Sequence, residues 1–177
     1  MAGYLKGLTL TFPKTSKLRP TQNRVKESIF NIIGNDCSGK KVLDLCCGTA
    51  SLGIEALSRG AESVVCVDTV IHTAKENIKR VKQLDPEANI SVIKGDGPTF
   101  LKRFTGEVDI IFLDPPYKIG ALYEGSLNRI FEFDILSAGG IVVCESSKKN
   151  TSIGDVTVQP TKQYQYGDTL ISVFERP

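Results

Sequence analysis

The hydrophobic positions of this chain fall into short runs typical of buried strands and longer stretches with helical spacing. Five apolar runs of five or six residues predict strands at residues 41–45, 63–68, 90–94, 108–113 and 141–145. Between these runs, apolar residues recur every three or four positions, which indicates helices. The predicted helices cover residues 51–59, 70–83, 98–104 and 122–133.

The two ends of the chain depart from this alternation. Residues 155–164 and 169–175 predict an antiparallel hairpin, and residues 5–12 predict a smaller one. A helix is expected over residues 22–33, with Thr21 as its cap. The pattern predicts an α/β fold: a mostly parallel sheet with helices on both faces, a C-terminal antiparallel hairpin, and a short N-terminal hairpin plus helix.

Composition narrows the class of protein. The chain has 177 residues, of which 41% are hydrophobic and 24% charged, as in a single globular domain. No run approaches the roughly 20 apolar residues of a membrane span, and the first residues lack the apolar core of a secretory signal. We therefore expect a cytoplasmic protein. Its five cysteines form no C-x-x-C pair, so we expect reduced thiols and no metal site.

The net charge of +2 conceals an uneven distribution. Residues 1–41 hold eight Lys or Arg against two acidic residues, whereas the remainder holds fourteen against eighteen. A basic end on a mildly acidic body favours a phosphate-rich partner, because Lys and Arg gain affinity by releasing counterions from it. A solvated basic surface is the alternative interpretation.

The loop after the first predicted strand suits a ligand that contains adenosine. Gly48, Ala50 and Gly53 follow the spacing G-x-G-x-x-G with alanine at the middle glycine, and Asp68 lies twenty residues after Gly48. A carboxylate at that distance can accept hydrogen bonds from ribose hydroxyls. Asp44 would repel a pyrophosphate but suits the sulfonium and ammonium groups of S-adenosylmethionine. A tight turn that binds no ligand is the alternative.

Three more residues belong to this predicted cofactor site. Thr49 lies within the loop, and Asp96 and Gly97 follow the third strand. The Asp96 carboxylate could accept a hydrogen bond from an adenine amino group, cap the next helix, or do both. Ala50 is compatible with the loop if its backbone φ is negative, since positive φ favours glycine.

The residues after the fourth strand, Asp114, Pro115, Pro116 and Tyr117, are the predicted catalytic residues. The two prolines lack N–H groups and restrict φ, which leaves a rigid peptide with outward acceptors. Asp114 and the Pro115 carbonyl can accept the two N–H groups of an exocyclic amine, while the Tyr117 ring can stack on a planar base. This arrangement orients an otherwise poor nucleophile.

This tetrapeptide resembles the D/N-P-P-Y/F motif of S-adenosylmethionine-dependent methyltransferases that act on amino groups attached to planar systems. Residues 3–13, 18–27 (LRPTQNRVKE) and 43–61 are similar to segments of bacterial 16S rRNA guanine-N2 methyltransferases of the RsmD type. The chain departs from that pattern at Cys46 and Cys47, which replace Phe-Ala, and at Ala50, which replaces glycine. We interpret the two cysteines as packing residues.

The resemblance implies a Rossmann-like fold and methyl transfer from S-adenosylmethionine to a guanine N2 amine of 16S rRNA in the small ribosomal subunit, leaving S-adenosylhomocysteine. It also implies that residues 1–35 form a basic RNA-contacting extension of a methyltransferase domain at residues 36–177, within a compact monomer. The predicted RNA contacts are Lys6, Arg19, Thr21 and Arg24. Arg24 could instead pair with an acidic neighbour, Glu27 or Glu55.

Two other functions remain open from the sequence. The same chemistry could act on the N6 amine of DNA adenine or on a protein amide nitrogen, because the Asp-Pro-Pro-Tyr motif does not distinguish these targets. A DNA enzyme would normally need an added recognition domain, for which 177 residues leave little room. A ribosome-assembly factor with weak or no catalysis is the third possibility, which Ala50 keeps open.

Overall fold

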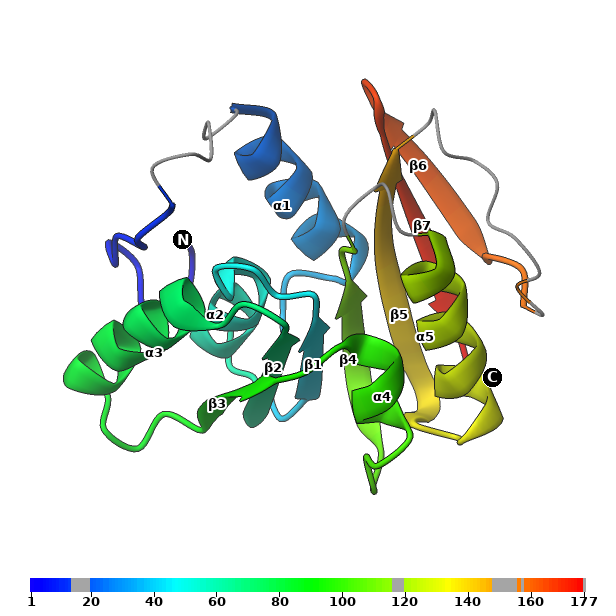
Figure 1. Cartoon of the computed structure of the whole chain (residues 1–177). Helices are drawn as coiled ribbons and strands as arrows, with labels where there is room; N and C mark the ends of the chain where they lie inside the picture. Colours follow the sequence, from blue (N-terminus) through cyan, green and yellow to red (C-terminus); the bar gives the residue numbers. More distant parts are fainter. Residues whose placement is uncertain (14–19, 116–119, 148–155, 157, 177) are drawn as a thin grey trace.

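The structure is a computed structural model that describes residues 1–13, 20–115, 120–147, 156 and 158–176. Within them, seven strands form one sheet and five helices pack against it (Figure 1). The strands are β1 (Lys41–Leu45), β2 (Ser63–Asp68), β3 (Ile90–Lys94), β4 (Val108–Leu113), β5 (Leu136–Ser147), β6 (Lys162–Tyr166) and β7 (Thr169–Glu175). The helices are α1 (Pro20–Ile32), α2 (Ser51–Ser58), α3 (His72–Leu84), α4 (Gly97–Leu101) and α5 (Gly120–Glu132).

The strand order is β3-β2-β1-β4-β5-β7-β6. Strands β1 to β5 are parallel, whereas β7 pairs antiparallel with both β5 and β6. The chain reverses its direction of travel across the sheet between β1 and β4, which are neighbours but not consecutive in sequence. Ligands of open α/β sheets bind beyond the carboxyl ends of the strands at such a reversal. The topology therefore selects one edge of the sheet for the site.

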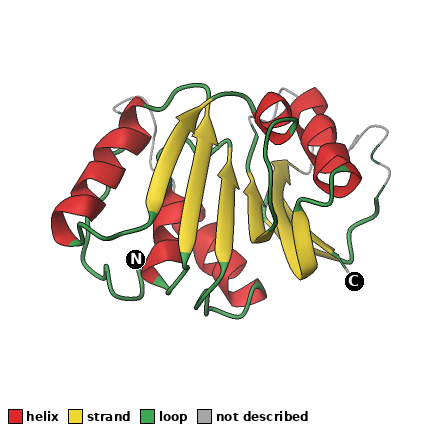
Figure 2. Cartoon of the chain, turned by 90° about the horizontal axis from the view of Figure 1, so that it is seen from below, coloured by secondary structure: helices red, strands yellow, loops and turns green. Residues whose placement is uncertain are grey.

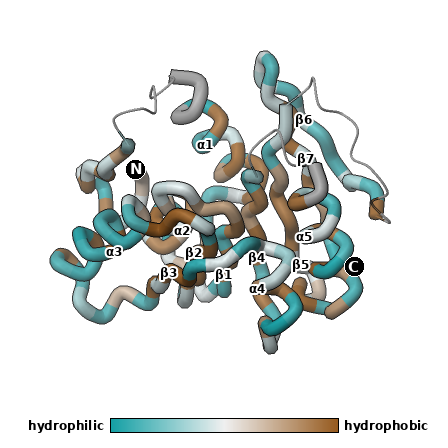
Figure 3. The backbone as a smooth tube through the Cα atoms, in the orientation of Figure 1, coloured by the Kyte–Doolittle hydropathy of each residue, from teal (hydrophilic) through white to brown (hydrophobic). Residues whose placement is uncertain are grey.

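Side chains of the central strands are buried on both faces of the sheet. Val42 and Phe112 pack in one core with α1, α2 and α3, whereas Leu43 and Ile111 pack in the other with α4 and α5. Helices lie on both sides of the sheet (Figure 2), and the central strands are its most hydrophobic elements (Figure 3). The near-continuous apolar runs arise because a parallel sheet covered on both faces buries successive residues.

The predicted α/β architecture and a C-terminal hairpin at one end of the sheet are confirmed, but the first strand of the hairpin is Lys162–Tyr166 and not 155–164. Four predicted strands match β1, β2, β3 and β4 residue for residue. The fifth is longer than predicted, because β5 already starts at Leu136. A register shift interrupts its pairing with β4 before Ile141, and the small residues at 137–140 that form this irregularity resemble a loop in sequence.

The prediction of an N-terminal hairpin is wrong. Residues 3–7 form turns, and no strand occurs within residues 1–13. The segment is held by helices instead: the Tyr4 amide donates to the Ser58 carbonyl at 2.9 Å, and the Thr11 amide donates to Asn77 Oδ1 at 2.7 Å. Leu5 and Leu10 are buried in the core beside these helices. Partners on α2 and α3 satisfy backbone groups that a second strand would otherwise have to pair.

The predicted cap of α1 is also wrong, because the helix starts at Pro20 and Thr21 lies inside its first turn. Proline suits a first helical turn, where its missing N–H has no intrahelical partner in any case. Among the described helices, none has both the length and the apolar character that crossing a bilayer requires.

Candidate active site

Four carboxylates lie at the carboxyl ends of four adjacent strands. Asp68 ends β2, Asp44 is the penultimate residue of β1, Asp114 follows β4, and Glu145 lies near the end of β5. All four line one cavity of about 410 Å³, within the range of small-molecule sites. Because these strands are neighbours in the sheet, the fold gathers acids that are up to about a hundred positions apart in sequence.

The loop that joins β1 to α2 bends through three residues with left-handed backbone conformation. Cys46, Gly48 and Ala50 have φ values of 60°, 55° and 61°. The condition under which alanine would fit this loop without strain, a negative φ, is therefore not met. This conformation explains why the resembling family has glycine there, since a Cβ in the left-handed region is strained. The Ala50 methyl group is fully buried, so the alanine is held in this conformation by its surroundings.

Asp44 is buried and anchors the start of α2. Its Oδ2 accepts a hydrogen bond of 2.9 Å from the Gly53 amide. Burial raises the pKa of Asp44 to about 7; the Gly53 hydrogen bond opposes this rise, and the nearby Asp68 charge adds to it. A buried carboxylate with such a pKa favours a cationic ligand, because a positive charge restores the stability of the ionised form.

Asp68 holds the two loops on either side of it. Its Oδ2 accepts a hydrogen bond from the Gly48 amide at 2.8 Å, and its Oδ1 accepts one from the Val70 amide at 2.9 Å. Each carboxylate oxygen can accept more than one hydrogen bond, so the predicted role toward ribose hydroxyls is compatible with these contacts. That role stays a prediction.

The third predicted carboxylate, Asp96, caps α4 through a hydrogen bond of 2.9 Å from the Thr99 amide to its Oδ1. This confirms the capping role, while the adenine contact stays a prediction. Gly97 is buried, and a Cβ there would lie 2.9 Å from Ser126 Oγ. Of the predicted cofactor residues, Asp44, Gly48, Thr49 and Asp68 line the cavity, whereas Ala50, Asp96 and Gly97 lie outside its lining.

Asp114 connects the cofactor side of the cavity to the predicted catalytic peptide. Its amide donates to the Leu45 carbonyl at 3.3 Å, which ties the end of β4 to the end of β1. Burial raises the pKa of Asp114 well above its usual range, and the charges of Glu145, Asp44 and Asp68 add to the effect. Pro115 is buried directly after it, whereas Pro116 and Tyr117 lie outside the described residues.

The predicted RNA contacts are only partly placed. Lys6 and Arg24 are exposed, Thr21 lies in the first turn of α1, and Arg19 lies outside the described residues. The pairing of Arg24 with Glu55 is wrong: the residue of α1 that pairs with Glu55 is Lys26, at 3.3 Å.

Sequence reasoning missed one wall of the cavity. This wall consists of Phe12 and Pro13 of the N-terminal segment, with Lys26 and Ile29 of α1. Glu145 was also missed, although it follows the rule that pointed to the other acids, since it lies at the carboxyl end of a predicted strand.

Cys46 lines the same cavity, and burial raises its pKa to about 12. Its thiol is therefore protonated at neutral pH.

The residues of this cavity fit S-adenosylmethionine. Asp68 supplies acceptors for hydroxyl groups, and the buried Asp44 favours the cationic sulfonium and ammonium groups. Within the described residues, no group of three or more His, Cys, Asp or Glu side chains is arranged to hold a metal ion. The fold and this site define an S-adenosylmethionine-dependent methyltransferase.

Comparison with known proteins gives the family. The model of the family described as "Conserved hypothetical protein 95" matches residues 1–175, so the chain belongs to this family. It is 37% identical to "Putative rRNA methyltransferase YlbH" of Bacillus subtilis, over 99% of this chain and 97% of that protein. It is 33% identical to "Ribosomal RNA small subunit methyltransferase D" of Haemophilus influenzae, over 84% of this chain and 78% of that protein. The resemblance predicted from the motifs is confirmed.

A solved structure supports the fold independently. The "Putative methyltransferase yhhF from Escherichia coli" superposes with a TM-score of 0.83 and 24% identity, over 99% of this chain and 95% of that one. At 99% coverage, the similarity in fold extends beyond the sheet to the N-terminal region.

Proposed function

We propose that this chain transfers the methyl group of S-adenosylmethionine to the N2 amine of a guanine in the rRNA of the small ribosomal subunit. The observation that carries the proposal is the position of Asp114. It directly follows β4, the strand next to β1, and lines the same cavity as Asp44 and Asp68. The names of the relatives from Bacillus subtilis and Haemophilus influenzae support rRNA as the substrate class.

In this proposal, the chain's main task is to orient the amine. The carboxylate of Asp114 and the Pro115 carbonyl accept its two N–H groups, which aims the nitrogen lone pair at the methyl group that the bound cofactor supplies. Because its pKa is raised, Asp114 readily takes the proton that the methylated nitrogen loses. The Tyr117 ring provides a stacking face for the guanine, which partly offsets the few kcal/mol needed to unstack it.

The same proposal assigns residues 1–35 to RNA contact and residues 36–177 to methyl transfer. Lys6, Arg19, Thr21 and Arg24 would contact phosphates or bases next to the target guanine. A substrate of this kind places the protein in the cytoplasm, where it would act as a monomer on the assembled or nearly assembled small subunit.

The test uses small ribosomal subunits from cells that lack this protein. They are incubated with the purified chain and S-adenosylmethionine, and the nucleosides are then analysed by mass spectrometry. The expected product is N2-methylguanosine, which the Asp114→Ala variant should not form. If the subunits stay unmodified while naked rRNA, DNA or protein becomes methylated, the proposed substrate is wrong. If no target is methylated although the cofactor binds, an assembly role without catalysis replaces the proposal.

A further inference from the structure

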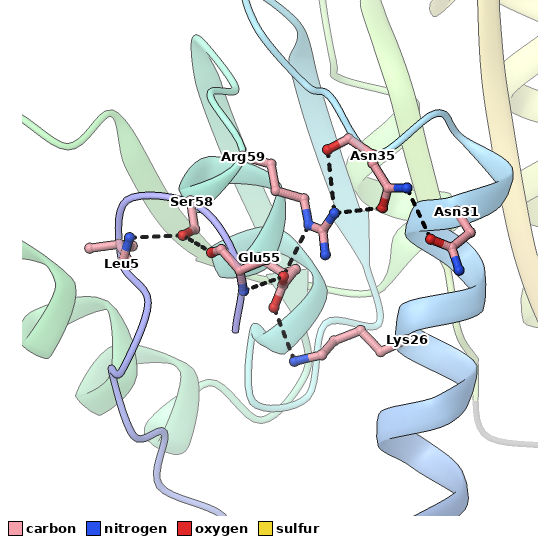
Figure 4. Close-up of polar contacts among 8 residues, drawn as sticks. Leu5, Lys26, Asn31, Asn35, Glu55, Ser58 and Arg59 are labelled. Carbon is pink, nitrogen blue, oxygen red and sulfur yellow. Dashed lines mark hydrogen bonds and ion pairs between the residues drawn. The ribbon is translucent and has the colours of Figure 1, made fainter.

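A buried carboxylate on α2 joins the N-terminal region to the rest of the protein. The side chain of Glu55 is only 2% exposed. Its Oε1 accepts hydrogen bonds from the Ala2 amide at 2.9 Å and from Arg59 Nε at 3.0 Å, while its Oε2 lies 3.3 Å from Lys26 Nζ (Figure 4). These contacts, with burial opposing them, lower the pKa of Glu55, so the carboxylate is charged. Lys26, Glu55 and Arg59 together carry one net positive charge.

Arg59 is held firmly on the far side of Glu55. Its Nη1 donates to Asn35 Oδ1 at 2.7 Å, and its guanidinium lies 4.5 Å from the centre of the Phe30 ring. These contacts fix the guanidinium beside Glu55, so the positive charge of Arg59 neutralises the charge of the Glu55 carboxylate. The ammonium group of Lys26 has three N–H donors, and its contact with Glu55 Oε2 is an ion pair at 3.3 Å. The excess positive charge of the cluster therefore lies on the Lys26 side.

Lys26 is also the link between this cluster and the cofactor cavity. It lines both the cavity of about 410 Å³ and an adjoining one of about 270 Å³ that contains Glu55 and Arg59. Among the described residues that line the larger cavity, Lys26 is the one cation, and four residues carry carboxylates. Asp44 suits the sulfonium and ammonium groups of the cofactor, but the four acids together would repel its α-carboxylate. A carboxylate in a partly buried site needs a cation or several donors to offset its desolvation.

We propose that Lys26 binds the α-carboxylate of the cofactor and that Glu55 is the positioning residue that holds Lys26 at this point. The inference rests on the proposed function, because it takes S-adenosylmethionine as the ligand. It assigns to the charged pair of α1 and α2 the recognition of the amino-acid end of the cofactor. A long lysine side chain loses conformational freedom on binding, and the ion pair with Glu55 restricts it before the ligand arrives.

Binding calorimetry with two ligands tests the role of Lys26. One ligand is S-adenosylhomocysteine; the other is its decarboxylated analogue, which keeps the adenosine, the sulfur and the amine. Lys26→Met should weaken binding of S-adenosylhomocysteine by about tenfold or more and change binding of the analogue by less than about twofold. The matched control, Lys75→Met, removes an exposed lysine of α3 and should affect neither ligand. Lys26→Arg should restore most of the affinity.

Equal losses for the two ligands would overturn the assignment of Lys26, because its effect would then not depend on the carboxylate. Glu55→Gln keeps the shape of the side chain and tests the positioning role. It should reduce the preference for the carboxylate-bearing ligand, and an unchanged preference would overturn that role even if the melting temperature falls. If the unchanged chain binds neither ligand, the cofactor assignment itself fails, and the role of Lys26 fails with it.

Discussion

The amide of Gly53 donates a hydrogen bond of 2.9 Å to the carboxylate of Asp44, and this contact joins the first turn of α2 to the end of β1. The backbone of Gly53 can approach β1 and β2 this closely because glycine has no side chain. A Cβ at this position would lie 2.9 Å from both Cys66 Sγ and Val64 Cγ1, and 3.1 Å from Asp44 Oδ2. The third glycine of the loop motif is therefore a packing requirement of helix against sheet.

Gly53→Ala should reduce both stability and cofactor affinity. The added methyl group forces α2 away from β2 and lengthens the hydrogen bond to Asp44, at a cost of about 1–3 kcal/mol. Thermal unfolding and calorimetry with S-adenosylhomocysteine measure the two effects. Gly95→Ala is the control for stability, because a Cβ there meets nothing within 4 Å. Similar melting temperatures for the two variants would contradict the packing argument.

The pKa of about 7 at Asp44 predicts a pH dependence that differs between cofactor and product. The ionised carboxylate attracts the sulfonium of S-adenosylmethionine, whereas the thioether of S-adenosylhomocysteine is neutral. Affinity for S-adenosylmethionine should therefore rise with pH through about 7 and then level off, and affinity for the product should rise less. Calorimetry between about pH 5.5 and pH 8.5 measures both curves. Asp44→Asn should remove the difference, and parallel curves for the unchanged chain would contradict the role of Asp44.

The strands of the sheet could be predicted because a strand that is buried on both faces consists of consecutive apolar residues. Val42 and Leu43, for example, point into opposite cores, and both are apolar because helices cover both faces of the sheet. The N-terminal segment could not be predicted in the same way. Its backbone pairs with Ser58 of α2 and Asn77 of α3, and a local pattern of alternating residues does not reveal partners so distant in sequence.

In the candidate site, too, some positions could be predicted from local sequence and others depend on tertiary packing. Asp44, Asp68 and Asp114 could be predicted because each follows a strand, and the carboxyl ends of parallel strands meet at one edge. The position of Lys26 in the cavity depends on how α1 packs against α2, which the charge pattern alone does not determine. The positive φ of Ala50 could not be predicted either, because alanine disfavours this conformation and the path of the loop imposes it.

Ala50→Gly should leave the protein equally stable or stabilise it by up to about 1 kcal/mol, because it relieves a left-handed alanine at the expense of one buried methyl group. Ala56→Gly is the matched control. Ala56 is equally buried but lies inside α2, where glycine should cost about 1 kcal/mol or more. Chemical unfolding of the two variants measures the difference. Equal destabilisation at the two positions would contradict a strained loop.

Asp114→Asn should reduce the rate of methyl transfer by about 10²–10⁴-fold while cofactor affinity changes little. The amide keeps the shape of the side chain but replaces one acceptor with a donor that opposes the N–H groups of the substrate. Asp109→Asn is the control at the opposite end of β4, where Asp109 accepts hydrogen bonds from the Lys41 amide and from Ser137 Oγ. It should lower stability but not the rate. A fully active Asp114→Asn variant would remove this residue from the reaction.

Replacing Lys6 and Arg24 together with glutamine should weaken RNA binding and flatten its dependence on salt. Both side chains are exposed on the N-terminal region, and each phosphate contact contributes roughly 0.7–0.9 to the slope of log affinity against log salt concentration. Removing two contacts should therefore lower the slope by roughly 1–2.

The control replaces Lys102 and Arg103, which are equally exposed but follow α4 on the opposite face of the sheet. Filter binding to small-subunit rRNA at several salt concentrations measures both slopes. If the two double variants lose equal slope, RNA contacts the protein through its overall charge. If only the N-terminal pair changes it, RNA lies along the side of the cavity that α1 and the N-terminal segment form.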